Sequence, residues 1–250
     1  MMSRHLSTVF DAGRSRDTSI IVRVGTTEGR FRMVMPELME QFHCACPDAR
    51  VDGVMAPADQ LRKMLENGEL DLVFSGLTLD TPDCIDQELL FDEHLYLVMS
   101  EEMARGVFPT GFEAHLNPAA DLGEFTEVPF CRSLPHLHCM QILDELLAEK
   151  GIRLQTVHVS GHFDLHQELA IRNYAACFTL TMYVPHLYQL NRLYENQLHV
   201  CPIKGLHGTN PVFLLWRKDL EMSPEAAAFA RLLKGKCAEL TKLDEQLNNF

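Results

Sequence analysis

The residues between Cys131 and Cys139 form the densest group of chemically capable side chains in this sequence. They read Cys-Arg-Ser-Leu-Pro-His-Leu-His-Cys, so thiols, imidazoles, a guanidinium and a hydroxyl follow one another closely. Thiolate and imidazole are zinc ligands, which makes a metal site the first hypothesis. The spacing argues against it, because His136 and His138 are closer together than zinc-binding histidines usually are. We therefore expect no metal here, and purely structural roles are an alternative for these side chains.

A second group contains His158, His162 and His166, spaced four residues apart. This spacing places two side chains on one helix face, but His158 falls in a predicted strand, which weakens the metal pattern. His162 and Phe163 follow the end of that strand, so both are candidates for lining a cleft. Imidazoles that face solvent or satisfy their own hydrogen bonds are the alternative.

Thr26 and Thr27 stand where a predicted strand ends and a helix begins. The amino end of a helix has free N–H groups and the positive end of the helix dipole, and both favour an anion. A hydroxyl adds one more donor. The alternative is an ordinary helix cap without a ligand.

The segment 74–78, Phe-Ser-Gly-Leu-Thr, follows a strand that is too apolar to lie on the surface. Small molecules bind open parallel sheets beyond the carboxyl ends of the strands. Phe74, Ser75 and Thr78 are therefore candidates for the edge of a binding cleft. Hydroxyls that only cap the loop backbone are the alternative.

Motifs for catalysis are missing from the sequence. It contains no G-x-S-x-G elbow, P-loop, H-E-x-x-H or G-x-G-x-x-G. The abundant carboxylates are explained by an acidic surface. We therefore expect a protein that is not an enzyme and uses no cofactor.

Amphipathic helices alternate with short apolar strands along the chain, a pattern typical of βαβ units and parallel sheets. The helix 58–67, for example, ends near Gly68 and leads directly into an apolar strand. A stretch rich in Gly, Pro and Phe, residues 105–124, divides the chain, and the same rhythm returns after it. The pattern indicates two similar α/β lobes. The expected strands are 20–25, 51–54, 70–75, 87–90, 94–99, 128–131, 156–160, 175–180, 198–203 and 211–216, and the expected helices are 31–42, 58–67, 140–151, 162–173 and one that begins at Pro224 after an N-cap at Ser223.

Composition limits the possible partners and compartments. The formal charge of −13 argues against a surface that binds nucleic acid. The start of the chain has no apolar segment of a secretory signal, and no apolar run is long enough to span a membrane. The eight cysteines follow neither a zinc-ribbon spacing nor the pattern of a secreted disulfide framework. We expect a cytoplasmic protein with reduced cysteines and no membrane contact.

Several motifs follow one another in order between residues 19 and 238. They are Val22-x-Val24-Gly25 with Thr26-Thr27, Met35-Pro36-x-Leu38-x-x-x-Phe42 with Pro47, Leu61-x-x-x-Leu65-x-x-Gly68-x-Leu70-Asp71-Leu72-Val73, Leu90-x-x-Glu93-x-Leu95-x-Leu97-Val98 and Ser223-Pro224-x-Ala226-x-x-x-Phe229. In order and spacing they resemble the effector-binding domain of LysR-type transcriptional regulators, which has the type 2 periplasmic-binding-protein fold. The first lobe matches well and the second only loosely.

The resemblance implies two Rossmann-like lobes joined by two crossover strands, with a small effector between the lobes. We expect lobe I to contain residues 19–99 and 206–240 and lobe II residues 100–205, with crossings near 98–101 and 202–205. Residues 1–18 are expected to be a flexible leader and 241–250 a C-terminal tail. Segment 131–139 becomes a turn at the cleft, where Arg132, Ser133 and His138 could hold a carboxylate. The candidate effector-binding residues are Thr26, Thr27, Phe74, Ser75, Thr78, Arg132, Ser133, His138, His162 and Phe163.

The sequence departs from the family in two ways. It shows no winged helix-turn-helix and no linker helix, so we expect this chain not to bind DNA directly. In the second lobe, residues 171–175 replace the usual glycine-rich turn, which leaves the shape of the pocket open. We expect an effector-sensing regulatory domain that binds a small anionic or aromatic metabolite and forms a homodimer, or a tetramer within a full-length regulator. The alternative is a solute-binding protein of a transporter, which has the same fold but requires export.

Overall fold

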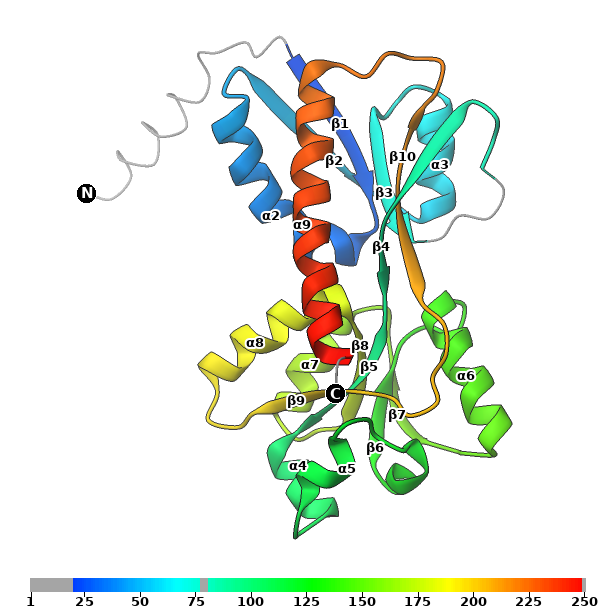
Figure 1. Cartoon of the computed structure of the whole chain (residues 1–250), viewed down its shortest axis with the longest axis vertical. Helices are drawn as coiled ribbons and strands as arrows, with labels where there is room; N and C mark the ends of the chain where they lie inside the picture. The colour runs from blue at the N-terminus through cyan, green and yellow to red at the C-terminus, as the bar shows by residue number, and fades with distance from the viewer. Residues whose placement is uncertain (1–19, 77–80, 249–250) are drawn as a thin grey trace, which may run out of the picture.

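The computed structural model describes residues 20–76 and 81–248, which form two five-stranded sheets flanked by helices (Figure 1). The first sheet has the strand order β2-β1-β3-β10-β4 and the second the order β7-β6-β8-β5-β9. This arrangement confirms the predicted α/β fold with two lobes. The strands are β1 Ile20–Thr26, β2 Ala49–Met55, β3 Leu72–Gly76, β4 Ile85–Glu93, β5 Leu95–Ser100, β6 Pro129–Arg132, β7 Gln155–Val159, β8 Ala176–Leu180, β9 Leu198–Pro202 and β10 Asn210–Arg217.

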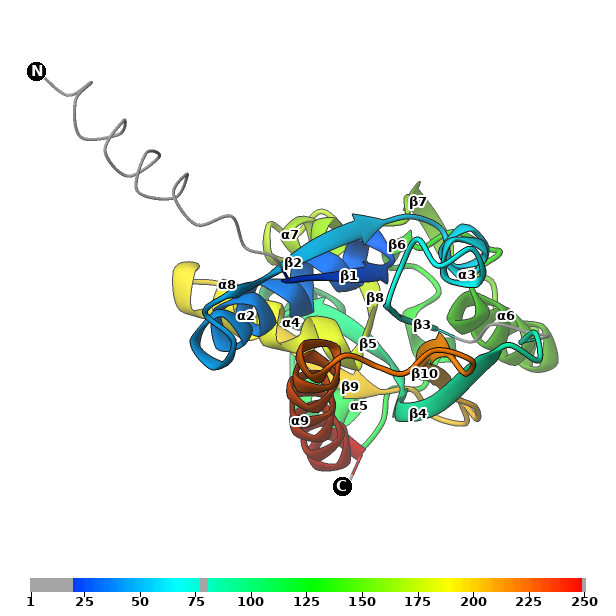
Figure 2. The same cartoon turned by 90° about the horizontal axis from the view of Figure 1, so that it is seen from above.

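The helices cover the faces of both sheets, as Figures 1 and 2 show. Apolar residues at helical spacing explain them: α2, for example, buries Val34, Met35, Leu38 and Phe42. The helices are α2 Glu28–Ala45, α3 Ala58–Glu66, α4 Glu101–Val107, α5 Phe112–Leu116, α6 His138–Lys150, α7 Phe163–Ile171, α8 Val184–Leu193 and α9 Pro224–Asn248, and the 3₁₀ turns are η1 Leu122–Phe125 and η2 Thr181–Tyr183.

Strand β3 begins two residues later than the predicted strand 70–75. The Asp71 backbone N–H already donates to the Arg23 carbonyl at 2.9 Å, but the Arg23 N–H donates to the Asp71 side-chain Oδ2 at 2.7 Å, where a regular ladder would use a backbone carbonyl. From Leu72 to Ser75 every strand residue is buried, as the apolar run predicts. The strand therefore ends at the middle of the molecule, where the two lobes meet.

The chain crosses between the sheets twice. Strand β4 ends at Glu93 in the first sheet and β5 begins at Leu95 in the second, so His94 alone forms the first crossing. The expected crossing near 98–101 lies inside or just after β5, which pairs with β8 and β9 in the second sheet. The second crossing lies between β9 and β10. The polar residues Asp92, Glu93 and His94 lie at this change of sheet, but no turn residue such as Gly or Pro accompanies them, so the sequence carries no clear signal for it.

The C-terminal helix is longer than predicted and belongs to both lobes. Ser223 caps it as expected, because its Oγ accepts from the Ala226 N–H at 3.1 Å. The helix contacts α2, β1 and β4 of the first lobe and reaches η2 and β9 of the second. The prediction of a tail over 241–250 is wrong, since residues up to Asn248 are helical and Asp244 and Leu247 are buried.

Candidate functional site

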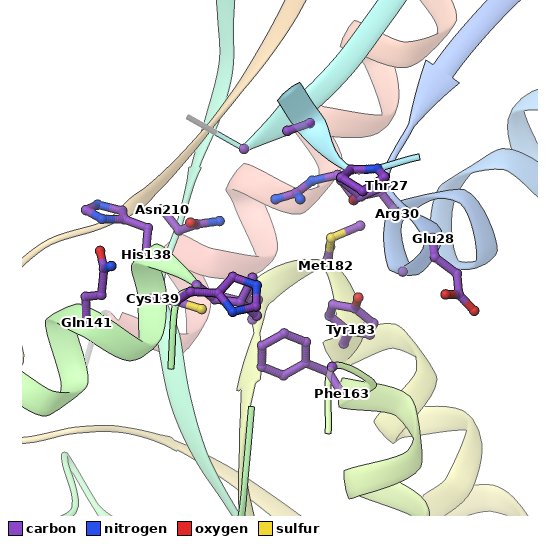
Figure 3. Close-up of a pocket in the computed structure, with 18 of the residues that line it drawn as sticks. Thr27, Glu28, Arg30, His138, Cys139, Gln141, Phe163, Met182, Tyr183 and Asn210 are labelled. Carbon is purple, nitrogen blue, oxygen red and sulfur yellow. The ribbon is translucent and has the colours of Figure 1, made fainter. Parts of the chain in front are cut away.

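A cleft of about 810 Å³ lies where the two lobes face each other (Figure 3). Both lobes contribute to its walls, so a molecule inside it would touch each of them. The lining residues are Thr27, Glu28, Gly29, Arg30, Pro57, Ala58, Asp59, Arg62, Gly76, His136, Leu137, His138, Cys139, Gln141, Gly161, Phe163, Leu180, Met182, Tyr183 and Asn210.

Among the described residues, four helices present their amino ends to this cleft. Helix α2 begins at Glu28, α3 at Ala58, α6 at His138 and α7 at Phe163, and all four residues line the cleft. Each amino end carries N–H groups without helical partners and the positive end of a dipole. Two of these ends come from each lobe. The cleft is therefore suited to an anion even though the whole protein is acidic.

The α2 terminus has an unused hydroxyl. Thr27 is the N-cap residue, yet its side chain makes no capping hydrogen bond and lines the cleft instead. The two alternatives for Thr27 were a cap or a ligand contact, and the geometry leaves its hydroxyl available for a ligand.

Arg30 extends this terminus with a fixed positive charge. Its Nη2 donates to Oε2 of the buried Glu93 at 2.5 Å, and the Asn210 Nδ2 donates to the same oxygen at 3.0 Å. Nη1 of Arg30 makes no hydrogen bond within the described part of the chain, and Arg30 lines the cleft. One side of the guanidinium is therefore anchored, while the other can meet a ligand.

An aromatic wall from lobe II faces the α2 terminus (Figure 3). Phe163 and Tyr183 pack with ring centroids 5.1 Å apart, and Met182 lies beside them in the cleft lining. Gly29 sits against this wall: a Cβ built on it would come 1.8 Å from the Tyr183 Oη. Only glycine lets the first turn of α2 approach Tyr183 this closely. The two lobes thus touch directly at one end of the cleft.

Two further contacts hold the lobes together beside the cleft. The Arg32 Nη2 in α2 lies 2.8 Å from Asp164 Oδ2 in α7 and 3.3 Å from the His162 Nδ1. On the outer side, Asp244 of α9 accepts from the Tyr96 Oη at 2.7 Å, and its Oδ2 lies 2.6 Å from the His94 Nδ1. These contacts bridge the crossing and the two lobes.

Three of the predicted site residues line the cleft: Thr27, His138 and Phe163. Of the other predicted residues that the structure describes, none is part of the cleft lining, and most have partners inside the protein. Thr26 donates to the Phe74 carbonyl at 2.6 Å, and Phe74 itself belongs to the core. Ser75 Oγ donates to the Gly76 carbonyl at 3.1 Å, so it caps backbone.

In lobe II, Arg132 pairs with Asp144 of α6 and does not line the cleft. Ser133 is buried, and its Oγ has no partner within the described residues. His162 contacts Arg32 beside the cleft, as described above. Thr78 lies outside the described residues.

Sequence reasoning missed the residues that give the cleft its charge and its aromatic wall, namely Arg30, Asn210, Met182 and Tyr183. Arg30 carried a usable signal, since it precedes Val34 by one helical turn and so places a charge on the buried face of α2. Tyr183 follows an apolar segment, and Asn210 follows a polar loop at the start of an apolar strand, both without any distinguishing pattern. Only the folded chain brings them beside Thr27.

The histidine and cysteine groups do not form a metal site: no cluster of three or more His, Cys, Asp or Glu suited to a metal exists among the described residues. His166 is buried, its Nε2 lies 2.9 Å from Ser160 Oγ, and burial lowers its pKa to about 4. Burial likewise raises the pKa of the Cys139 thiol to about 12. A thiol that stays protonated is a poor nucleophile, so Cys139 lines the cleft as a neutral group.

Comparison with known proteins identifies the architecture. A family model described as the LysR substrate binding domain matches residues 16–238 of this chain. No curated protein matches the chain in sequence. Within the described residues, no helix has the length and apolar character needed to cross a membrane.

Solved structures share the fold at low sequence identity. The effector-binding domain of QuiR in complex with shikimate has a TM-score of 0.62 and 16% identity, over 88% of this chain and 97% of that chain. The BenM effector-binding domain with its effector benzoate has a TM-score of 0.65 and 14% identity, over 88% of this chain and 93% of that chain. HinK, a LysR family transcriptional regulator from Pseudomonas aeruginosa, has a TM-score of 0.68 and 15% identity, over 94% of this chain and 77% of that chain.

Proposed function

The chain belongs to the LysR substrate binding domain family, and we propose that it senses a small anionic metabolite, with an aromatic or cyclic body, bound between its two lobes. The family membership makes it a regulatory effector-binding domain and disfavours the alternative of a transporter's solute-binding protein. The ligand class follows from the cleft itself. QuiR and BenM were solved with shikimate and benzoate, which are both cyclic carboxylates.

The convergence of four helix amino ends on one cleft carries this proposal. Their N–H groups, the Thr27 hydroxyl and the unbonded Nη1 of Arg30 can all donate hydrogen bonds to a molecule in the cleft, and they come from both lobes. A carboxylate accepts such bonds and gains from the dipoles. A neutral ligand would gain less than a carboxylate from these donors and from the helix dipoles.

The second wall selects the body of the ligand. Phe163, Met182 and Tyr183 offer apolar and aromatic surface opposite the donors. A planar ring can stack on such a surface, while His138 at the start of α6 can contact a second polar group. We therefore assign Thr27, Arg30, His138, Phe163 and Tyr183 as the main contacts of the ligand.

Binding between the lobes gives the ligand a way to act. A molecule that touches both lobes stabilises the arrangement in which both sets of contacts are made, and this differential affinity is what regulation requires. We propose that the domain does this without catalysis, as a homodimer, in the cytoplasm. Contacts with DNA are expected from other parts of the regulator, since this domain carries a formal charge of −13.

A thermal-shift screen tests the proposal, because a ligand that binds only the folded state stabilises it by about 2.7 kcal/mol at one hundred times its Kd. The panel contains cyclic and linear carboxylates, including benzoate and shikimate, each paired with its neutral amide or methyl ester. We expect stabilisation by one or more acids and not by their neutral partners. The Arg30→Gln variant should bind the acid at least tenfold more weakly, judged by the apparent Kd from the thermal shift. The Arg192→Gln variant changes an exposed arginine and should bind the acid like the parent protein. Equal effects of acids and neutral partners would contradict the proposal.

A further inference from the structure

We infer that Glu93, behind the wall of the cleft, takes up a proton when an anion binds to Arg30, so that effector binding is linked to pH. The inference rests on the proposed anion site and adds a proton as a second ligand of that site. It follows from the position of Glu93, its hydrogen bonds and the charges around it.

Glu93 is fully buried, and its carboxylate is only half satisfied. Oε2 accepts from the Arg30 Nη2 at 2.5 Å and from the Asn210 Nδ2 at 3.0 Å. Oε1 is also buried, yet no hydrogen bond reaches it within the described residues. An ionised carboxylate has about four acceptor positions, so this one is poorly stabilised by hydrogen bonds alone. Its ionised state therefore depends on the opposite charge of Arg30.

Arg30 is the one formal positive charge that faces Glu93 among the described groups. The other titratable groups that interact with it are the thiols of Cys139 in α6 and Cys237 in α9, and the phenol of Tyr183 in η2. Burial raises the pKa of each thiol to about 12 and also raises the pKa of the phenol, so all three are neutral near pH 7. The Asn210 amide and the Met182 backbone lower the pKa of Glu93 as uncharged hydrogen-bond donors, so neither supplies a counter-charge.

Burial already raises the pKa of Glu93 above its usual value, even though the Arg30 charge opposes that shift. An anion bound at Arg30 offsets part of the guanidinium charge. The carboxylate of Glu93 then loses its counter-charge in a site that water does not reach. Protonation is the response that avoids an uncompensated buried charge, so the proton moves from solvent to Glu93 as the anion binds.

The same coupling works in reverse, because linkage between two bound ligands is reciprocal. A proton on Glu93 frees Arg30 to bind an anion more tightly. Between the pKa of Glu93 in the free protein and its higher pKa in the complex, the Kd for an anion should rise by up to about tenfold per pH unit. Outside that interval the Kd should be independent of pH through this group.

The first experiment uses the full chain without any effector. Carbon-13 NMR of the protein labelled at glutamate carboxyls follows each titration, and the signal lost in Glu93→Gln identifies Glu93. In Arg30→Gln and Arg30→Met, which both remove the charge, the Glu93 midpoint should rise by about one pH unit or more. Arg30→Lys, which keeps the charge, should move it much less. An unchanged midpoint in a folded charge-removing variant would overturn the inference.

If Arg30→Gln and Arg30→Met both fail to fold, each is combined with Glu93→Gln. These double variants remove both buried charges and should restore folding if the pair is coupled. If the double variants are no better folded than the single ones, Arg30 and Glu93 do not depend on each other and the inference fails.

A second experiment uses benzoate as the probe. Sodium benzoate is added to the parent protein in weak buffer with a pH indicator, at a pH one unit above the Glu93 midpoint found by the NMR titration. We expect proton uptake that saturates together with benzoate binding, and no uptake in Glu93→Gln. Binding without uptake in the parent overturns the inference but leaves the proposed function intact. Absence of benzoate binding counts against the proposed ligand class, and the NMR titration then still decides the role of Glu93.

Discussion

Two buried carboxylates lie close to the first crossing, Glu93 on its cleft side and Asp244 on its outer side, and they differ in how the protein treats their charge. Burial is the largest influence on both and acts to raise the pKa of each. For Glu93 it prevails, and the pKa is raised. For Asp244 the hydrogen bonds from His94, Thr181 and Tyr96 outweigh it, and the pKa is lowered.

The number and placement of donors explain the difference. Both oxygens of Asp244 are used: Oδ1 accepts from Tyr96 and Thr181, and Oδ2 faces His94 at 2.6 Å and Asn248 at 3.3 Å. Glu93 receives its hydrogen bonds on one oxygen only. A satisfied carboxylate is a structural connection, while a half-satisfied one can still respond to its surroundings. We call the Asp244 side of the crossing the fixed side, because hydrogen bonds hold that carboxylate in its charged form. We call the Glu93 side the responsive side, because the protonation of Glu93 can change.

The largest expected effect is on the fixed side. Asp244→Ala leaves Tyr96, Thr181 and His94 without their common acceptor and should lower the free energy of unfolding by about 3 kcal/mol. Glu93→Gln should cost less, about 1 kcal/mol, because Arg30 can turn toward the hydrated cleft. Urea denaturation at pH 7 measures both, with the exposed Glu245→Ala on the same helix as control. Equal losses at Asp244 and Glu93 would remove the distinction between the two sides.

A smaller effect is expected from Asn210→Ala, which removes one of the two side-chain donors to Glu93. The loss in unfolding free energy should be about 1 kcal/mol at a pH well above the folded pKa of Glu93 and smaller at a pH below it. The sign follows from the raised pKa of Glu93: stability from a protonated Glu93 is present below its unfolded value of 4.5 and is lost as pH rises through the folded pKa. Thr209→Ala, which removes an exposed bond to Asp92, is the control. A loss that does not change with pH would show that Glu93 does not change its protonation state over that range.

The smallest effect concerns His94, whose imidazole is partly exposed. The hydrogen bond to Asp244 raises its pKa above 6.5, so its contribution is complete below that value and is lost as pH rises through the folded pKa. His94→Gln should therefore cost about 1 kcal/mol at pH 6 and clearly less at pH 9, after allowance for solvent screening. Denaturation at the two pH values measures this. The opposite trend would mean that the neutral imidazole is the favoured partner of Asp244.

The two-lobed α/β fold could be predicted from the sequence, because apolar runs indicate the described strands and helical spacing indicates α2, α3, α6, α7 and α9, although α4, α5 and α8 were not predicted. It was harder to predict which individual residues line the cleft. Thr26 and Thr27 are neighbours at a strand end, and successive strand side chains point to opposite faces. One of them ties β1 to β3 and the other lines the cleft, and the sequence pattern does not say which.

Contacts distant in sequence were the least predictable. Asn210 reaches Glu93 because the two residues pair across β10 and β4, a register that depends on the whole sheet. The end of α9 looked like a tail, because its polar residues form no stripe that demands burial. Asp244 is buried there through partners that come from the first crossing and from η2.

The length of α9 bears on how the domain can move. Its 25 residues form a rod of about 37 Å that packs on lobe I and is fastened near its far end to lobe II. A rod held at two points does not stretch gradually when the lobes rotate. Rotation of lobe II would take Tyr96 and Thr181 away from Asp244, while Asn248 on the same helix would stay with it, so such a rotation has to break two buried hydrogen bonds at the end of this rod.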